Sequence, residues 1–364
     1  MLDLKIITKK VVFRLPKSKI VLFDAVNKKI VIDTILFQYD YFVLDTRGGE
    51  VVLNYRALLK LFKRILSFNN KSFKGYIKFI KKQYFLSVID TINPTILLTY
   101  IDNDPYFHKI CKARPGIVGI GIQNGARTHY NYSDKTKEKF NIPYYFVHGN
   151  HAKSTYISYG HQCKKIFEVG SIKLDYYMAR FKSEVKYRYQ ICLISTWTSG
   201  ETLNGVYPFS SKNQYNSLLQ IKNVIKKQKY SLVVALKTNT QSEKDFYKDL
   251  FADTADYHYS DNDMGSYDIC MKSKVILSTY STLGFEMQAI GKDVIFFNLC
   301  SDKRYTHSSP NTITSTDNDK LFSLINRSIS GNFYYKYNTD SDIHCVFNKP
   351  PSYELIKIFI DSKL

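Results

Sequence analysis

Residues 275–297 read Val-Ile-Leu-Ser-Thr-Tyr-Ser-Thr-Leu-Gly-Phe-Glu-Met-Gln-Ala-Ile-Gly-Lys-Asp-Val-Ile-Phe-Phe, and this stretch decides the fold. Residues 275–277 and 294–297 are short apolar runs, of the kind that parallel strands bury on both faces. The residues between them predict a helix that ends at Gly291, because glycine is the usual residue after a helix C-terminus. Strand, helix and strand in this order indicate a βαβ unit.

The turn before this helix carries the first candidate site. Ser281, Thr282 and Gly284 bring hydroxyl and backbone N–H groups to a helix N-terminus, where an anion is stabilised. Glu286 is expected in the first turn, with its carboxylate facing the mouth of the site, where it can accept hydrogen bonds from a ribose diol. The alternative is a βαβ unit whose helix is merely capped by Ser and Thr.

This stretch resembles the donor-nucleotide element in the C-terminal domain of GT-B glycosyltransferases. The resemblance rests on Ser281-Thr282-Leu283-Gly284-Phe285-Glu286 and on the tail Ala289-Ile290-Gly291-Lys292-Asp293-Val294-Ile295. Among these enzymes, the chain is similar to bacterial surface-carbohydrate transferases, including those that use CMP-activated Kdo or sialic-acid-like sugars. Many CMP-sugar enzymes of this fold carry His-Pro after the second strand of the C-terminal domain, whereas this chain has Lys237-Thr238-Asn239.

Composition limits the class of protein. The chain has 364 residues, enough for two domains, and its 44% hydrophobic and 15% aromatic content excludes a mainly disordered chain. A net charge of +20 favours polyanionic partners, so nucleic-acid binding is one alternative function. The sequence shows no zinc finger, RNA-recognition signature or obvious helix-turn-helix, and we therefore expect no nucleic-acid partner.

The remaining global features favour a reduced, cytoplasmic protein. Six cysteines are scattered without a CxxC pair, which argues against a structural zinc site. The chain does not open with a secretory pattern, and no apolar run approaches the roughly 20 residues that span a bilayer.

Residues 55–82 interleave basic and apolar side chains. This mixture suits helices that lie on an anionic membrane surface, and we therefore expect a peripheral membrane contact. A core-packed helix with a basic outer face is the alternative.

Two strands in the first half end in polar clusters. Residues 95–101 form a central-strand candidate that leads into Asp102-Asn103-Asp104, and residues 117–122 lead into Gln123-Asn124-Gly125-Ala126-Arg127. Because parallel strands end at one edge of a sheet, these groups point towards its crevice. Asp102 and Asp104 are candidates for acid–base or nucleophilic roles. Asn103, Gln123, Asn124 and Arg127 are candidates for binding the acceptor or sugar.

An Asp-Asn-Asp triplet can hold a divalent cation. The triplet recurs at 261–263, however, which argues that it occurs by chance, so no metal site is expected.

Further candidates lie at later strand ends. Asp175 follows a Gly170-Ser171 turn near a helix start, where it is either catalytic or an ordinary first-turn carboxylate. Residues 191–195 form a strand followed by a small-residue loop that includes Thr196 and can approach a phosphate. Residues 231–236 predict a buried strand that exits at Lys237, whose charge can neutralise a phosphate leaving group.

The resemblance implies an α/β protein of GT-B architecture, with two Rossmann-like, doubly wound domains facing a central cleft. The expected ranges are 1–185 for the acceptor-side domain, 186–340 for the nucleotide-sugar domain, and 341–364 for a C-terminal helix that packs back on the first domain. The donor phosphate would lie at Lys237, Ser281 and Thr282, and the ribose at Glu286, while Asp102 and Asp175 would flank the anomeric carbon.

The function implied is a metal-independent glycosyltransferase with no cofactor. Its co-substrate would be a nucleotide sugar, with CMP-linked Kdo or a related nonulosonic acid as the best candidate, and its acceptor a lipopolysaccharide, capsule or other surface glycan. A sugar-nucleotide epimerase or a polyol-phosphate transferase on the same fold is the alternative.

Overall fold

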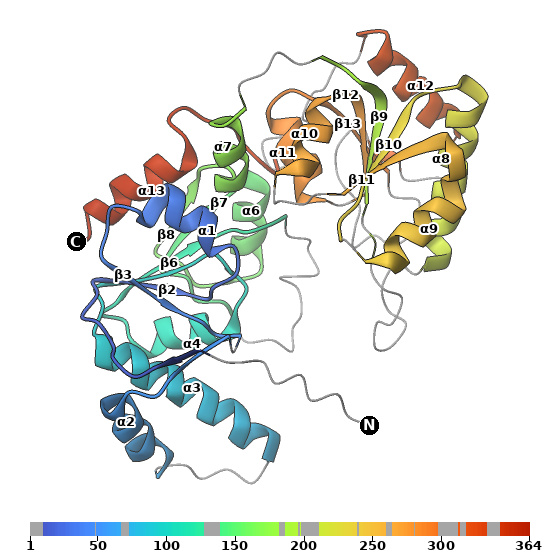
Figure 1. Cartoon of the computed structure of the whole chain (residues 1–364). Coiled ribbons are helices and arrows are strands. Elements are labelled where there is room, and N and C mark those ends of the chain that lie inside the picture. Colours follow the sequence, from blue (N-terminus) through green and yellow to red (C-terminus); the bar gives the residue numbers. More distant parts are fainter. Residues whose placement is uncertain are drawn as a thin grey trace, which may run out of the picture.

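The computed structural model describes residues 10–47, 49–66, 73–126, 139–181, 186–195, 197, 211–238, 240–259, 264–279, 281–297, 312–313, 318–332 and 343–364. These residues form two α/β units, each built on a six-stranded parallel sheet with helices on both faces (Figure 1). The α/β class predicted from the sequence is therefore confirmed. Across the described residues, we find no helix both long and apolar enough to cross a membrane.

The N-terminal sheet has the strand order β3-β2-β5-β6-β7-β8. Residues 20–23 and 96–99 are buried throughout because β2 and β5 lie inside the sheet. Alternate side chains pack on opposite faces, with Val21 and Phe23 in one core and Ile20 and Leu22 in the other. The strands are β2 (Ile20–Phe23), β3 (Tyr41–Leu44), β5 (Ile96–Thr99), β6 (Val118–Ile122), β7 (Tyr144–Val147) and β8 (Lys165–Glu168).

The helices of this unit fill the crossovers between strands. A separate two-stranded parallel sheet pairs β1 (Lys10–Val12) with β4 (Glu50–Val52). A helical hairpin follows it and packs beside α4. The helices are α1 (Lys28–Val31), which continues as a π-helix (Ile32–Leu36), α2 (Tyr55–Ile65), α3 (Phe73–Ile92), α4 (Pro105–Ala113), α6 (Asn150–Ser158) and α7 (Ile172–Met178).

The C-terminal sheet has the order β11-β10-β9-β12-β13-β14, in which the direction of winding reverses between β9 and β12. Ligands of open α/β sheets bind at the carboxyl ends of strands beside such a reversal. The strands are β9 (Tyr189–Ile194), β10 (Leu232–Ala235), β11 (Ala255–His258), β12 (Ser273–Ser278), β13 (Asp293–Phe297) and β14 (Thr312–Ile313). The helices are α8 (Ser211–Gln228), α9 (Gln241–Phe251), α10 (Gly265–Met271), α11 (Thr282–Ala289) and α12 (Asn318–Ile329), with a 3₁₀ turn at Ala252–Thr254.

The last segment of the chain returns to the first unit. Ile356 and Ile360 of α13 (Ser352–Asp361) are fully buried in the core of the N-terminal sheet. The approach runs over two glycines, since a Cβ on Gly149 would lie 2.5 Å from the carbonyl oxygen of Ile343 and one on Gly170 would lie 2.4 Å from that of Val346. Glycine at both positions therefore lets the returning chain lie against the ends of β7 and β8.

Candidate functional site

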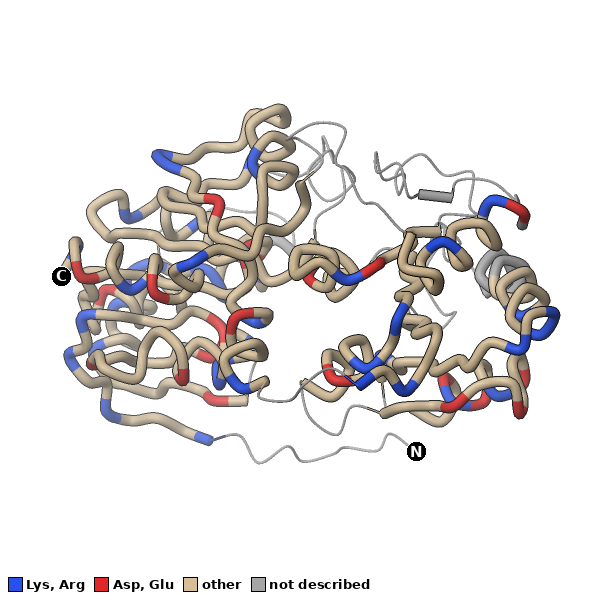
Figure 2. The backbone as a smooth tube through the Cα atoms, turned by 90° about the horizontal axis from the view of Figure 1, so that it is seen from above, with Lys and Arg blue, Asp and Glu red and all other residues tan. Residues whose placement is uncertain are grey.

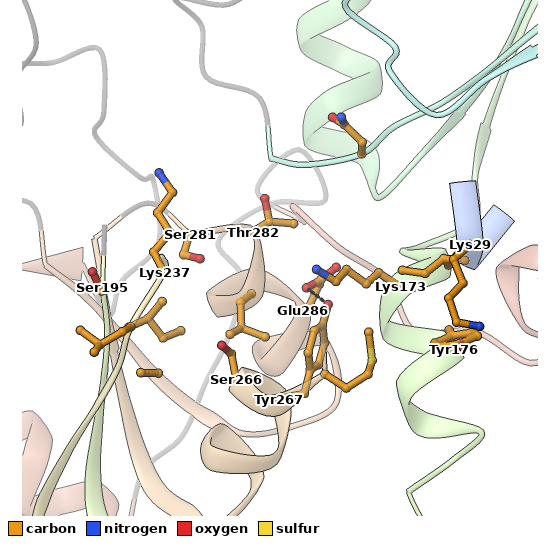
Figure 3. A pocket seen from close by; sticks show the side chains of 17 residues that line it. Lys29, Lys173, Tyr176, Ser195, Lys237, Ser266, Tyr267, Ser281, Thr282 and Glu286 are labelled. Atoms are coloured by element: carbon orange, nitrogen blue, oxygen red, sulfur yellow. Dashed lines mark hydrogen bonds between the residues drawn. The ribbon is translucent and has the colours of Figure 1, made fainter. Parts of the chain in front are cut away.

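A cavity of about 720 Å³ lies between the two units, at the carboxyl ends of their strands. Its size is in the range of small-molecule and cofactor sites. One wall comes from α1, α7 and the turn after β6, and the other from the ends of β9 and β10 and the starts of α10 and α11 (Figure 3). Of the predicted site residues, the described lining includes Asn124, Lys237, Ser281, Thr282 and Glu286.

The N-terminus of α11 faces this cavity. Ser281 is the N-cap residue, but its side chain makes no hydrogen bond to a backbone N–H of the helix. Thr282 uses its hydroxyl oxygen to accept a hydrogen bond from the backbone N–H of Ala126, at 2.8 Å, and so ties α11 to the turn after β6. The Ser281 hydroxyl and the positive end of the helix dipole are thus available to an anion in the cavity.

Glu286 is buried, with 2% of its surface exposed, yet it lines the cavity. One carboxylate oxygen accepts a hydrogen bond from the hydroxyl of Ser171, the N-cap residue of α7, and the other accepts one from Tyr267 at 2.6 Å. Burial raises the pKa of Glu286, while these two hydrogen bonds and the charge of Lys173 oppose the rise. Each oxygen keeps a further lone pair for a ligand hydroxyl.

Glu286 lies deeper than the sequence suggested. It is the fifth residue of α11, in the second turn of the helix, so the expectation of a first-turn carboxylate was wrong. Gly284 does not line the cavity in the described structure. A Cβ there would lie 2.7 Å from Oγ of Ser278 and 3.1 Å from the ring of Phe296, so this glycine lets α11 pack on β12 and β13.

The charge of the described cavity lining is positive. Lys29, Lys173 and Lys237 line the cavity, and Glu286 is the acid among the described lining residues. Lys173 extends towards Glu286 (Figure 3), whereas Lys29 forms a 2.7 Å ion pair with Asp33. Lys and Arg are spread over both units (Figure 2), so the cavity is one positive region of a basic protein. An anionic ligand is favoured there.

A second buried carboxylate shapes the cavity from behind. Glu243 is fully buried and accepts hydrogen bonds from the backbone N–H groups of Lys237, at 2.9 Å, and Thr238, at 2.6 Å. It also accepts hydrogen bonds from the hydroxyls of Thr238 and Ser195. The Glu243 side chain therefore holds the residues that follow both β9 and β10. Glu243 was not among the predicted site residues, although Thr240-Gln241-Ser242-Glu243 has the S/T-x-x-E pattern of a capping box.

Asp102, predicted as catalytic, and Gln123, predicted to bind the acceptor or sugar, lie one layer behind the cavity. Asp102 is 1% exposed, and its carboxylate accepts hydrogen bonds from Tyr145 Oη, at 2.6 Å, and from the backbone N–H of Asn124, at 3.3 Å. Gln123 is also 1% exposed, and it bonds the backbone N–H of His148 and the carbonyl oxygen of Gly125, both at 2.8 Å. Both side chains shape the turn that presents Asn124 to the cavity.

Asp104 and Asp175 occupy helix starts. Asp104 is the N-cap residue of α4 and accepts from the backbone N–H of Tyr106 at 2.7 Å; burial raises its pKa. Asp175 accepts hydrogen bonds from the backbone N–H of Ser352, at 2.6 Å, and from the Ser352 hydroxyl, and burial raises its pKa. The structure places neither carboxylate in the described cavity lining.

Three other predicted site residues remain. Asn103 is exposed beside Asp104, while Arg127 and Thr196 lie outside the described residues.

The sequence matches a protein-family model described as "putative O-antigen biosynthesis protein" over residues 120–316, which is more than half of the chain. The chain belongs to this O-antigen biosynthesis family. The matched region holds every described lining residue of the cavity except Lys29 and Ile30. The comparison with curated proteins gives no match.

Solved structures with a similar fold include UDP-GlcNAc 2-epimerases and a lipopolysaccharide galactosyltransferase. UDP-GlcNAc 2-epimerase from Neisseria meningitidis, bound to UDP-GlcNAc, aligns with a TM-score of 0.58 at 15% identity, covering 97% of this chain and 99% of that one. The Methanocaldococcus jannaschii UDP-GlcNAc 2-epimerase, in complex with UDP-GlcNAc and UDP, gives 0.57 at 13% identity, with 94% and 99% coverage. The lipopolysaccharide outer core galactosyltransferase WaaB gives 0.52 at 12% identity, with 95% and 99% coverage. The GT-B fold predicted from the sequence is confirmed.

Proposed function

We propose that this protein is a glycosyltransferase of surface-polysaccharide biosynthesis that takes its sugar from a nucleotide-activated donor. The observation that carries the proposal is the interdomain cavity, which is lined by a helix N-terminus, by lysines from both units and by a buried carboxylate. A nucleotide sugar has a matching set of groups, namely an anionic phosphate and a ribose diol. Family membership in O-antigen biosynthesis supports a polysaccharide product.

In this proposal the phosphate of the donor lies at the start of α11. Lys237, the Ser281 hydroxyl and the first N–H groups of the helix would bind it, and Glu286 would accept hydrogen bonds from the ribose. As the bond to the anomeric carbon breaks, negative charge builds up on the departing phosphate. Fixed positive groups stabilise that charge more in the transition state than in the ground state, and so they accelerate the reaction.

Asp102 acts in this proposal through Asn124. Its carboxylate fixes the turn that brings Asn124 to the cavity wall opposite α11. The amide of Asn124 can bind a sugar hydroxyl as donor or acceptor. Asp102 is thus proposed as a positioning residue, and Asp175 as an anchor for α13.

The donor that the sequence resemblance favours is CMP-linked Kdo or a related sugar. A thermal-shift screen against CMP, CDP, UDP and GDP tests the nucleotide, because a ligand that binds the native state raises its stability. We expect one cytidine or uridine nucleotide to raise the melting temperature. The matching nucleotide sugar, incubated with purified lipopolysaccharide or capsule acceptors, should then yield a glycosylated product.

The second candidate is a sugar-nucleotide epimerase, and the fold similarity to two UDP-GlcNAc 2-epimerases favours it. The discriminating experiment incubates the protein with UDP-GlcNAc without acceptor and follows the sugar by NMR. Conversion to a second UDP-sugar would contradict the transferase proposal and support an epimerase. Release of UDP that depends on an added acceptor glycan would support it.

A further inference from the structure

The outer face of α2 carries large apolar side chains in contact with solvent. Tyr55, Leu59, Phe62 and Leu66 are 63%, 57%, 63% and 70% exposed, and Leu58 is 39% exposed. Positions 55, 58, 59, 62 and 66 recur at helical spacing and form one stripe along the helix, here named the α2 stripe. A helix of a globular domain normally turns such a stripe towards the core.

The core-facing side of α2 is a different one. Ala57 is 2% exposed and belongs to the hydrophobic core, and α2 packs lengthwise on α3. The hairpin of α2 and α3 forms the outer end of the N-terminal unit, away from the C-terminal unit (Figure 1). Near the start of α2, Leu53 and Phe13 add further exposed apolar surface, at 41% and 66%, and the Asn54 amide bonds the carbonyl oxygen of Phe13 at 3.0 Å.

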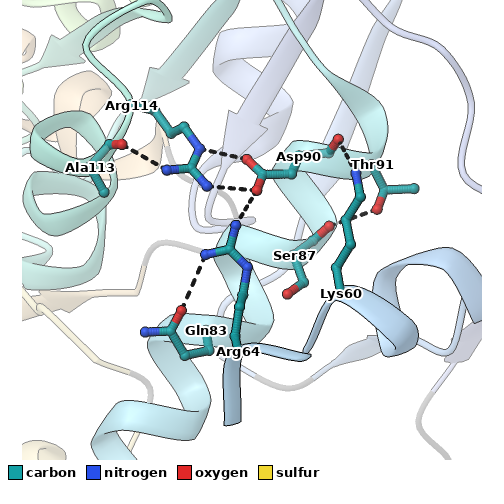
Figure 4. Close-up of polar contacts among 8 residues, drawn as sticks. All are labelled: Lys60, Arg64, Gln83, Ser87, Asp90, Thr91, Ala113 and Arg114. Carbon is teal, nitrogen blue, oxygen red and sulfur yellow. Dashed lines mark hydrogen bonds and ion pairs between the residues drawn. The ribbon is translucent and has the colours of Figure 1, made fainter. Parts of the chain in front are cut away.

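One acid holds the inner side of this hairpin together. Asp90 of α3 forms ion pairs with Arg64 of α2 and with Arg114, while Lys60 donates a 2.6 Å hydrogen bond to the Asp90 carbonyl oxygen (Figure 4). Burial alone would raise the pKa of Asp90, but the hydrogen bond from Arg114 and the charges of Arg114, Arg64 and Lys60 hold it below its ordinary value. The inner cations therefore serve the packing of α2 on α3.

Within the described part of the chain, Arg56 and Lys63 on the outer side form no ion pair with an acid. Asp90 is the one acidic residue between Glu50 and Asp102 in the sequence, so α2 itself carries none. Arg56 and Lys63 are exposed and border the α2 stripe by helical spacing. A second copy of this surface would place like charges face to face. An anionic surface would pair with them and at the same time cover the apolar side chains.

We propose that the α2 stripe docks on an anionic lipid bilayer. The helix would lie in the plane of the interface, with Leu59, Phe62 and Leu66 in the boundary between headgroups and acyl chains, and Arg56 and Lys63 at the lipid phosphates. The α2 stripe contains no residue that lines the interdomain cavity, so this proposal does not depend on the proposed function.

The experiment is sedimentation of the full chain with vesicles of pure phosphatidylcholine or of phosphatidylcholine with phosphatidylglycerol. The protein should bind the anionic vesicles, and the variant Leu59→Ser/Phe62→Ser should bind them about tenfold more weakly or worse, because two apolar side chains no longer enter the interface. Lys63→Glu should also weaken binding to anionic vesicles, by about tenfold, because an attraction to the lipid phosphates becomes a repulsion.

Two matched controls separate docking from general attraction by a basic protein. Ile157→Ser removes an apolar side chain that is 58% exposed on α6, and Lys227→Glu reverses an exposed charge on α8. Both should bind as the unaltered protein does, and circular dichroism should show that all variants are folded. The proposal is overturned if the unaltered protein does not sediment with anionic vesicles. It is equally overturned if the control variants and the α2 stripe variants lose the same amount of vesicle binding. It is also overturned if sedimentation velocity shows a dimer that Leu59→Ser/Phe62→Ser dissociates, because the stripe would then bind a second copy.

Discussion

The hydroxyl of Ser171, at the start of α7, donates a hydrogen bond to the buried carboxylate of Glu286 in α11. These residues belong to different units, so the carboxylate proposed to bind the ribose also joins the walls of the cavity. Tyr267, which lies in the C-terminal unit, donates the second hydrogen bond to the Glu286 carboxylate. Ligand binding and domain contact are therefore linked at one side chain.

Changing either partner should separate these two roles. Glu286→Gln should weaken binding of the nucleotide about tenfold, since hydrogen bonds to a charged acceptor contribute more than those to a neutral one. Ser171→Ala keeps the carboxylate and should lower the free energy of unfolding by about 1–2 kcal/mol, with a smaller effect on affinity. Isothermal titration and urea unfolding measure the two quantities. Equal affinity losses in both variants would argue against the ribose role.

The cavity lysines should differ from other surface lysines in their effect on nucleotide binding. Lys237→Met should raise the Kd for the nucleotide about tenfold and flatten its dependence on salt, because a charge beside the phosphate is lost. Lys248→Met, an exposed position on α9, is the matched control and should leave the Kd unchanged. If both variants respond alike, the phosphate does not lie at the exit of β10.

Asp175→Asn should act on stability rather than on chemistry. The carboxylate receives two hydrogen bonds from Ser352 at the start of α13, and losing its charge should cost about 1.5–3 kcal/mol of unfolding free energy. Ser352→Ala should reproduce part of this loss. Kinetics at a temperature where both variants are folded check the assignment: a kcat that falls a hundredfold only in Asp175→Asn would return Asp175 to the reaction centre.

Acid should destabilise the fold through His108, which is 5% exposed and stacks on Phe140 at 4.3 Å. Burial lowers its pKa from 6.5 to about 4. The unfolded chain therefore binds more protons between these values, so stability is complete above pH 6.5 and is lost as the pH falls towards 4. A shift of this size corresponds to about 3 kcal/mol.

His108→Phe keeps a ring against Phe140 and removes the titrating group. Its unfolding free energy should fall less steeply between pH 6.5 and 4 than that of the unaltered protein, as measured by urea unfolding in a pH series. Some slope should remain, because burial also lowers the pKa of His161, on the other side of Phe140, to about 4. Parallel curves for the two proteins would contradict a neutral, buried His108.

Much of the fold could be predicted from local sequence. The apolar runs at 20–23, 231–236 and 294–297 are strands because their side chains are buried on both faces, and apolar runs carry that information directly. The helix between Ser281 and Gly291 was predictable from its cap residues, and the structure has α11 there. The helices α4 and α6 were not predicted. In α6 the apolar residues follow no regular helical spacing. In α4, Phe107, Ile110 and Cys111 do recur at helical spacing, but its N-cap residue Asp104 was interpreted as a strand-end functional group.

The candidate site was less predictable because its polar residues interact across long distances in sequence. Asp102 has a strand-end position typical of catalysis, but Tyr145, 43 residues later, binds its carboxylate behind the cavity wall. Asp175 is similarly engaged by Ser352, 177 residues later. No local pattern reveals such partners. Ser281, Thr282 and Lys237 reach the cavity because they follow strands of one sheet, a relationship that strand order alone fixes.

Because α13 packs in the N-terminal unit, that unit is built from two segments that are far apart in the sequence. Ile356 and Ile360 complete the interior of the first unit, although the whole second unit is synthesised before them. A fragment that stops at Phe181 would thus leave a gap beside Ile172 and Tyr176, and the two halves cannot be divided by a single cut. The N-terminal unit therefore completes its core only after α13 has been synthesised.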